Sequence, residues 1–542
     1  MSKLFHKTIV SVLLIGCLGV QAQLTPEQSA GIDSLFLDWN RPNHPGGAIA
    51  VMQGDQVVYS KAFGLASMEY LVPNTTETRF NVASVSKQFS ALAIVRLQLQ
   101  GKLSIDDTID KYIDGLASFG HEITIRQMLH HTSGLRSLHA LFALAGWRDD
   151  DTRTNGDLNR IIAQQTELNF EPGSEYLYCN TGYMFLVNII EKVTGIPFVD
   201  YMKNEVFIPL GMMDTYVEDA YDRIVPNNAT SYNKTKDGFV RSVEYWGYVG
   251  SGNMHTTTAD LLTYLKNYYD PTPGWERAFA MMQTLDPLTD GSPNEYAFGV
   301  VVDDFLGRKR VGHGGSIGGF RANIAVFPDE KTSIAITTNF SASGPAGKSN
   351  QIAKVLFGGP VTKAVKVVPV SEGKKQSYAG LYLDGDTYTE REVIFEGDTL
   401  YFGNGNSAYL PVKETVYVNT DSEIASTIEF NNGKLTFRPE SGKPMVFSKF
   451  KEEPLTPQLA ESYVGTYYSP EIATTYTIHF EKEKLYAHHI RHGQIPLVQR
   501  KQDLLEGGFP LSHLKFNREN GEIKGVWISN GRVRNLWFVK TK

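Results

Sequence analysis

A serine and a lysine three positions apart, Ser84 and Lys87, open an apolar segment. The segment from Ser84 to Gln100 predicts a helix closed by Gly101, and residues i and i+3 of a helix share one face. A serine hydroxyl is a weak nucleophile until a base takes its proton. A lysine in an apolar, electropositive pocket loses its charge and becomes such a base. Taken alone, the pair would better suit a helix-capping serine and a solvated lysine.

A second segment, residues 170–183, contains Tyr178 and Asn180. A tyrosine beside a cationic lysine has a lowered pKa and can relay protons to a leaving group. An asparagine amide can hold a substrate carbonyl or fix the lysine. Alone, the segment would also fit a buried aromatic side chain in a turn.

A third segment, residues 311–320, reads VGHGGSIGGF. Gly314 and Gly315 would let a substrate backbone approach a strand closely, and a backbone N–H there could help to form an oxyanion hole. His313 could contact the substrate or the proton relay. The alternative is a glycine-rich hairpin with an incidental histidine.

Together, Ser-x-x-Lys, Tyr-x-Asn and His-x-Gly in this order resemble the penicillin-recognising serine hydrolases, in the branch related to class C β-lactamases. The segments MLHHTSGL, FEPG and TTTADLLTY are similar to further marks of that family. The resemblance covers about residues 30–357 and implies a β-lactamase/transpeptidase-like domain.

The resemblance also implies a role for each motif residue. Ser84 would be the acylated nucleophile, and Lys87 and Tyr178 would exchange protons with it, with the leaving group and with the deacylating water. Asn180 would position the substrate. The oxyanion hole would use the N–H groups of Ser84 and Ser316, and Gly314 and Gly315 would keep that strand open.

His313 stands where β-lactamases and carboxypeptidases of the family usually have a lysine. A lysine supplies a fixed charge for a substrate carboxylate, whereas a histidine is largely neutral at pH 7. This substitution argues against β-lactams or C-terminal D-alanine as the main substrate. The His-x-Gly form resembles the D-aminopeptidase, D-peptidase and esterase members, some of which carry C-terminal β-barrel or lipocalin-like domains. In the D-aminopeptidase relatives, a loop from such a domain reaches the active site.

The chain pattern predicts an α+β catalytic domain at residues 23–357. Residues 46–64 and 321–340 each predict two strands around a turn, and residues 347–357 a closing helix, so we expect an antiparallel sheet flanked by helices. Residues 358–376 are expected to form a linker. Beyond it, SYAGLY returns as SYVGTY, which predicts two small all-β domains at 377–452 and 453–542.

The first 22 residues predict a secretory signal peptide, so we expect an exported, periplasmic or secreted protein. LIGC ending at Cys17 also resembles a lipoprotein box, which leaves lipid anchoring as the alternative. Only Cys17 and Cys179 are present, so the mature chain would form no internal disulfide. The formal net charge is −7 and no basic block occurs, which argues against nucleic acid as a partner; no later stretch predicts a membrane span.

The sequence therefore predicts a serine hydrolase that acts through an acyl-Ser84 intermediate and needs no metal or organic cofactor. The leading prediction is a peptidase on short peptides, including those with D-residues. The alternatives are an esterase of small acyl esters, a weak β-lactamase or D,D-carboxypeptidase, and a non-catalytic protein that binds cell-wall material. His488 and His492 could lie on one face of a strand and bind a metal, but a solvated strand face is the favoured interpretation. The oligomeric state is left open.

Overall fold

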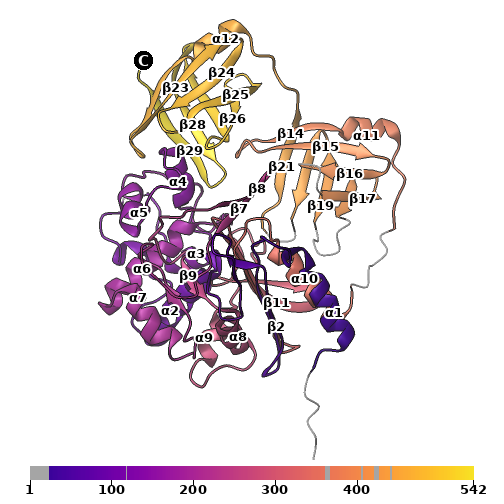
Figure 1. The fold of residues 1–542 in the computed structure, drawn as a ribbon. Helices are drawn as coiled ribbons and strands as arrows, with labels where there is room; N and C mark the ends of the chain where they lie inside the picture. Colours follow the sequence, from indigo (N-terminus) through magenta and orange to yellow (C-terminus); the bar gives the residue numbers. More distant parts are fainter. Residues whose placement is uncertain (1–22, 117–118, 360–365, 404–406, 420–425, 440–441) are drawn as a thin grey trace, which may run out of the picture.

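The computed structural model describes residues 23–116, 119–359, 366–403, 407–419, 426–439 and 442–542. The expected signal segment, with Cys17, lies outside the described residues. Three units follow one another along the chain: a mixed helix–sheet unit that ends with Phe357, and two closed eight-stranded β barrels (Figure 1). This confirms the α+β fold followed by two all-β units.

A six-stranded antiparallel sheet forms the centre of the first unit, in the order β10-β11-β12-β13-β1-β2. The two strand pairs predicted at either end of this unit are adjacent, because β13 pairs with β1. The strands are β1 Gly47–Gln53, β2 Gln56–Phe63, β10 Val301–Phe305, β11 Arg308–Ile317, β12 Phe320–Phe327 and β13 Thr332–Thr338.

Alternation along β1 gives the sheet two different faces. Ile49 and Val51 belong to the core beneath α1 (Pro26–Ser34) and α10 (Pro345–Phe357), the predicted closing helix. Ala48 and Ala50 point to the other face, where their small side chains leave room for α8 (Thr258–Leu265) to pack closely. Helices therefore cover both faces of the sheet.

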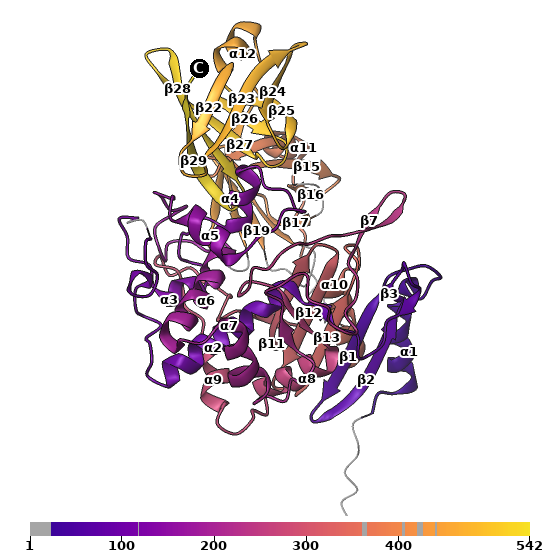
Figure 2. The same ribbon diagram turned by 60° about the vertical axis from the view of Figure 1, so that its left-hand side comes forward.

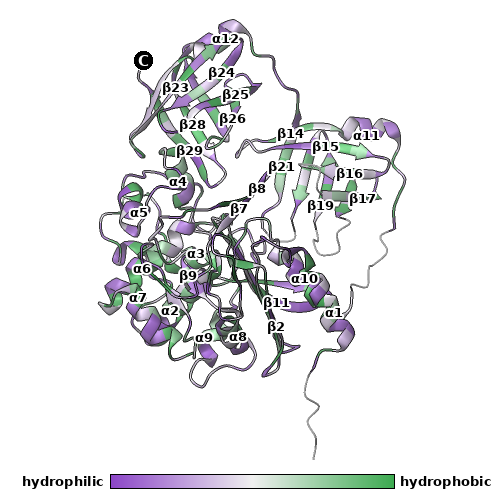
Figure 3. Ribbon diagram, in the orientation of Figure 1, coloured by the Kyte–Doolittle hydropathy of each residue, from purple (hydrophilic) through white to green (hydrophobic). Residues whose placement is uncertain are grey.

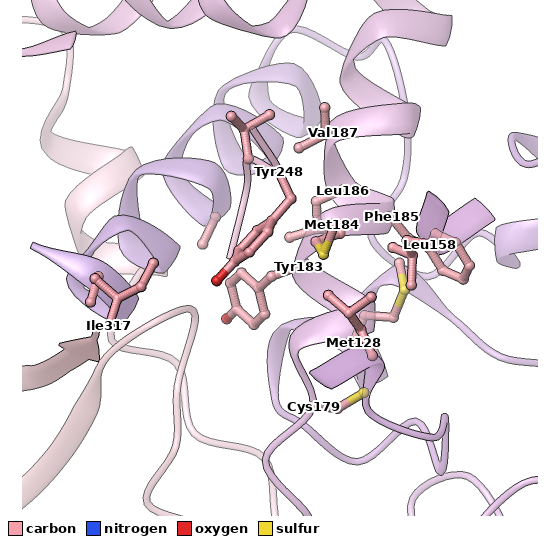
Figure 4. Close-up of a cluster of buried hydrophobic side chains, with 14 of the residues drawn as sticks. Met128, Leu158, Cys179, Tyr183, Met184, Phe185, Leu186, Val187, Tyr248 and Ile317 are labelled. Carbon is pink, nitrogen blue, oxygen red and sulfur yellow. The ribbon is translucent and has the colours of Figure 1, made fainter. Parts of the chain in front are cut away.

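A helical region lies beside this second face and surrounds the buried helix α2 (Lys87–Leu99), which packs against α6 (Asn180–Thr194). Apolar residues concentrate in the interior of this region (Figure 3). Figure 4 shows part of this core, where α6 presents residues from Tyr183 to Val187 and Ile317 of β11 closes the opposite side. The other helices are α3 Ile125–Leu129, α4 Leu138–Leu144, α5 Asn155–Ile162, α7 Phe198–Tyr201 and α9 Glu276–Met281.

Short strands and single turns complete the first unit. The strands are β3 Leu65–Ser67, β4 Val72–Pro73, β5 Phe80–Asn81, β6 Tyr216–Val217, β7 Tyr232–Thr235, β8 Gly238–Arg241 and β9 Met254–Thr256. The 3₁₀ turns are η1 Leu37–Trp39, η2 Ala83–Ser86, η3 Ile109–Lys111 and η5 Lys266–Tyr268, and η4 Met202–Phe207 is a π-helix. Among the described residues no single helix is long and apolar enough to cross a membrane, although α6 and the segment Phe198–Phe207, which meet at a bend of 80°, pass that test as a pair.

Each barrel begins in the same way, which explains the sequence repeat. The Tyr382 hydroxyl donates to the Tyr378 carbonyl at 2.7 Å in the first barrel, and the Tyr467 hydroxyl donates to the Tyr463 carbonyl at 2.8 Å in the second. Both donor tyrosines are buried, and each bond ties the first strand to the helix before it. The repeated letters therefore encode one repeated packing arrangement.

The barrel elements follow in chain order. The first barrel has α11 Glu372–Tyr378, β14 Gly380–Asp384, β15 Glu390–Glu396, β16 Thr399–Phe402, β17 Ser407–Lys413, β18 Val416–Asn419, β19 Thr427–Asn431, β20 Lys434–Arg438 and β21 Met445–Phe450. The second has α12 Pro457–Tyr463, β22 Gly465–Ser469, β23 Thr474–Glu481, β24 Lys484–His489, β25 Gly493–Lys501, β26 Leu504–Gly507, β27 His513–Glu519, β28 Glu522–Asn530 and β29 Val533–Lys540. Residues 372–376, at the end of the expected linker, lie in α11, where Lys375 donates to Asp398 and to the Gly397 carbonyl.

The second barrel sits on the helical region of the first unit, with β29 close to α4 in both views (Figures 1 and 2). Arg136, whose side chain is 1% exposed, donates to Glu471 of the barrel at 2.8 Å. The Tyr476 hydroxyl donates to the Leu144 carbonyl at 2.9 Å. Most buried apolar residues of the helical region and of this barrel belong to one continuous cluster. The barrel is thus packed into the molecule.

Candidate active site

Ser84 lies in a strained turn. The prediction placed it in the first turn of a regular helix, but Ala83–Ser86 is a 3₁₀ turn and α2 starts at Lys87. Ala83 has a φ of 50°, a left-handed conformation that is unfavourable for alanine. Its N–H donates to the Asn81 side chain at 2.9 Å, and Asn81 donates to Asn253 at 3.0 Å. These buried amides hold the turn that presents the Ser84 hydroxyl.

The Lys87 amine is fully buried next to Ser84. Its nitrogen donates to Asn180 Oδ1 at 2.7 Å and to the Ser251 carbonyl at 2.7 Å, and it lies 3.2 Å from Ser84 Oγ. A neutral amine uses its two N–H groups on these two acceptors, which leaves its lone pair for the Ser84 hydroxyl. No acidic side chain among the described residues forms an ion pair with it. Burial, and secondly the charge of Arg532, lower the pKa of Lys87 well below its usual value. A neutral amine in this place can accept a proton from Ser84.

Tyr178 lies over Lys87, with the amine 4.8 Å from its ring centroid. Burial raises the pKa of the Tyr178 hydroxyl, whereas Ser84 and Arg532 act in the opposite direction. Within the described part of the chain, that hydroxyl makes no hydrogen bond of normal geometry. His131 holds this loop, because the Cys179 N–H donates to its Nδ1 at 3.1 Å. Cys179 itself is buried, with a raised pKa, and does not line the cavity described below.

The end of β11 passes directly behind the Ser84 turn. A Cβ on Gly315 would stand 2.2 Å from the Val82 carbonyl oxygen, so only glycine fits there. A Cβ on Gly314 would meet nothing closer than 3.9 Å. Ser316 follows and is exposed to the cavity. The close approach brings the backbone of Ser316 to the same cavity as Ser84.

His313 uses both ring nitrogens within the protein. Since a carbonyl only accepts, Nδ1–H donates to the Gly314 carbonyl, and Nε2 then accepts from the Tyr296 hydroxyl at 2.9 Å. Burial and the nearby Lys87 lower the pKa of His313 to about 4. The ring is therefore neutral at pH 7 and does not supply the positive charge of the lysine that it replaces. Its hydrogen bonds link the third motif to Tyr296.

These residues surround one cavity of about 780 Å³. The predicted residues that line it are Ser84, Tyr178, Asn180, His313, Gly314, Gly315 and Ser316. Lys87 lies behind this wall and reaches Ser84 from the protein interior. Two residues of the second barrel, Phe509 and Arg532, line the same cavity.

Sequence reasoning did not identify Ser251, Tyr296, Phe509 or Arg532. Ser251 acts through its carbonyl, which no side-chain motif reveals. The sequence SNGRV does mark a tight hairpin at Arg532, but a local signal does not tell which distant residues a hairpin tip meets.

In the histidine-rich segment at 488–492, His488 of β24 is exposed, whereas His489 and His492 are used in packing. His489 accepts from or donates to Thr474 at 2.8 Å, and the His492 ring contacts the Ala143 carbonyl at 2.8 Å. Among the residues that the structure describes, no cluster of three or more His, Cys, Asp or Glu is arranged to hold a metal ion.

Comparison with known proteins finds relatives among the β-lactamase-like hydrolases, as the geometry of the site suggests. The Beta-lactamase family matches residues 35–357. Penicillin-binding protein 4* of Bacillus subtilis is 28% identical over 403 residues, which are 68% of this chain and 86% of that protein. A D-aminopeptidase of Brucella anthropi is 28% identical over 346 residues, which are 63% of this chain and 64% of that protein.

Among solved structures, the octameric penicillin-binding protein homologue from Pyrococcus abyssi aligns with a TM-score of 0.55 and 26% identity, over 78% of this chain and 99% of that one. The family match spans more than half of the chain and includes every motif residue from Ser84 to Ser316. The chain therefore belongs to the Beta-lactamase family, and it is a serine hydrolase of that family.

Proposed function

We propose that this enzyme hydrolyses an amide bond of short peptides through an acyl-Ser84 intermediate. The observation that carries the proposal is the contact of 3.2 Å between Ser84 Oγ and the fully buried Lys87 amine, which lacks an acidic partner among the described residues. Burial holds the pKa of this amine well below its usual value, so it can serve as a general base, a role typically worth about 10²- to 10⁴-fold in rate.

In the acylation step, Lys87 takes the Ser84 proton while Oγ attacks the scissile carbonyl carbon. The N–H groups of Ser84 and Ser316 stabilise the oxyanion. The C–N bond then breaks, and the leaving nitrogen receives a proton from the Tyr178 hydroxyl, which Lys87 restores. The products of this step are the free amine and the Ser84 ester.

In the deacylation step, a water molecule gives a proton to the same Lys87–Tyr178 pair and attacks the ester carbonyl. The bond to Ser84 Oγ breaks and Oγ regains a proton, which releases a carboxylic acid. Asn180 accepts from Lys87 through Oδ1, so its amide nitrogen is directed elsewhere and can donate to the substrate carbonyl. One set of groups therefore serves both steps.

The substrate class rests on the relatives and on the third motif. The relatives include D-aminopeptidases, which favours short peptides with D-residues. A neutral His313 does not supply the fixed charge that a lysine in its place would offer to a substrate carboxylate.

The test is labelling with a fluorophosphonate, followed by intact mass, beside Ser84→Ala and Lys87→Met. The wild type is expected to gain one adduct, Ser84→Ala none, and Lys87→Met is expected to label at least 100-fold more slowly because its base is missing. Turnover is then compared among D- and L-alanyl p-nitroanilides, p-nitrophenyl acetate and a chromogenic cephalosporin. The comparison ranks peptidase, esterase and β-lactamase activity.

Fastest turnover of the D-alanyl amide supports the proposal. Turnover of the ester alone would replace it with an esterase. A wild type that neither labels nor turns over any substrate would overturn the hydrolytic role of Ser84.

A further inference from the structure

The cavity at Ser84 is completed by the second barrel. Arg532 stands at the tip of the two-residue turn between β28 and β29, next to Gly531, whose φ of 40° suits that turn. Its backbone carbonyl accepts from the Ser137 N–H at 3.1 Å and from the Asn169 side chain at 3.1 Å. The first unit therefore clamps the hairpin tip by its backbone, and this leaves the side chain available.

The guanidinium of Arg532 projects to the reacting groups. Its central carbon lies 4.8 Å from the centroid of the Tyr178 ring, and the residue as a whole is exposed in the cavity. Within the described residues, neither a hydrogen bond nor an ion pair engages this guanidinium. A planar cation with unused donors is suited to a carboxylate.

Neighbouring arginines of the same interface are engaged elsewhere. Arg136 pairs with Glu471, Arg491 with Asp151 and Arg534 with Glu175. In the cavity wall, Arg153 pairs with Asp149, and Arg321 donates to two backbone carbonyls. The wall thus carries three arginines against one aspartate, and Arg532 is the one on the Tyr178 ring.

The third motif of the catalytic unit supplies no such cation itself. His313 is occupied by Tyr296 and by the Gly314 carbonyl, so it offers a bound substrate neither a charge nor a donor. The second barrel brings a fixed charge to the same cavity from a different direction. Since Tyr178 protonates the leaving nitrogen in the proposed mechanism, a group bound at Arg532 belongs to the leaving side of the scissile bond.

We infer that Arg532 is a specificity-determining residue that binds a carboxylate on the leaving-group side of the substrate. The inference rests on the proposed amide hydrolysis and names the substrate class for it: peptides whose released residue bears a carboxylate.

The test compares two anilides that differ only in this group, D-alanyl-4-aminobenzoate and D-alanyl-4-aminobenzamide. The ratio of their kcat/KM values is the readout, because any effect of Arg532 on Lys87 acts on both substrates and cancels. We expect the wild type to prefer the acid, and Arg532→Gln to lower the ratio by about 10- to 100-fold, mainly through KM for the acid.

Two variants and one condition sharpen the comparison. Arg534→Gln removes a charge two residues away that pairs with Glu175, and the ratio should stay at the wild-type value. Arg532→Lys keeps the charge without the planar fork and should give an intermediate ratio. Added salt should lower the wild-type ratio and leave that of Arg532→Gln nearly constant.

A wild type without preference for the acid, or an Arg532→Gln ratio equal to that of Arg534→Gln, would overturn the inference. The two anilides are also tested for how strongly each slows the labelling of Ser84 by the fluorophosphonate. This protection measures binding selectivity if turnover is slow. A wild type that is not labelled at all would instead contradict the proposed function, so the two failures can be distinguished.

Discussion

At the scale of single residues, the chemistry depends on keeping one lysine neutral. Burial is the main reason for the low pKa of Lys87, and the Arg532 charge is the second. The three hydrogen bonds of the amine go to a hydroxyl, an amide oxygen and a carbonyl, and none of these is a carboxylate that would hold the proton in place.

Replacement of Arg532, the second cause of the low pKa of Lys87, should shift the pH dependence of activity. Arg532→Gln takes a positive charge away from Lys87, which favours the protonated amine and raises its pKa. Protonated Lys87 accepts no proton, so activity appears as pH rises through this pKa. The acidic limb of kcat/KM should therefore move to higher pH for the neutral anilide substrate. The measurement is a pH–rate profile beside Arg534→Gln, and identical acidic limbs in both variants would contradict it.

The residues that could be read from the sequence are those held by local spacing or by family motifs. Ser84 and Lys87 meet because they are three positions apart, even though the turn is 3₁₀ instead of α-helical. The hydrogen bond at His313 Nε2 depends on Tyr296, and the position of Arg532 depends on how a barrel docks. Tertiary contacts of this kind leave no periodic pattern in the chain.

At the scale of elements, β11 and the Ser84 turn form a close contact that requires one glycine. The order of the sheet places β11 beside β12, and the end of β11 then passes the Val82 carbonyl. The sequence predicted the flanking strand pairs and the closing helix, because their alternation and turn residues are local signals. It did not predict which of the clustered glycines is required by packing.

Gly315→Ala should therefore be more damaging than Gly314→Ala. The added methyl group on Gly315 would stand 2.2 Å from a backbone oxygen, whereas on Gly314 it would have 3.9 Å of clearance. We expect Gly315→Ala to cost about 1–3 kcal/mol of stability, as overpacking does, and to slow labelling of Ser84 by displacing β11. Thermal unfolding of both variants measures this, and equal melting temperatures would show that the strand relaxes at little cost.

At the scale of the whole molecule, the second barrel is part of the active-site architecture. A buried ion pair, shared backbone contacts and a continuous apolar cluster fix it on the helical region. Ser137 links this interface to the site, because its N–H donates to the Arg532 carbonyl and its Oγ accepts from the Asn180 N–H at 3.3 Å. The sequence repeat predicted two barrels, but their docking depends on surfaces that become adjacent only in the folded chain.

The ion pair between Arg136 and Glu471 should therefore control both stability and activity. Arg136→Met leaves a buried carboxylate without its partner, and such losses cost about 3–5 kcal/mol. The double variant Arg136→Met/Glu471→Leu removes both charges and should recover much of that loss. The exposed interface pair of Arg491 and Asp151 provides the matched control, because Arg491→Gln should cost under about 1 kcal/mol. Thermal unfolding and the labelling rate of Ser84 are measured together. If Arg136→Met and Arg491→Gln behave alike in both measurements, the barrel is held by its apolar contacts, and the buried pair has no specific role in placing Arg532.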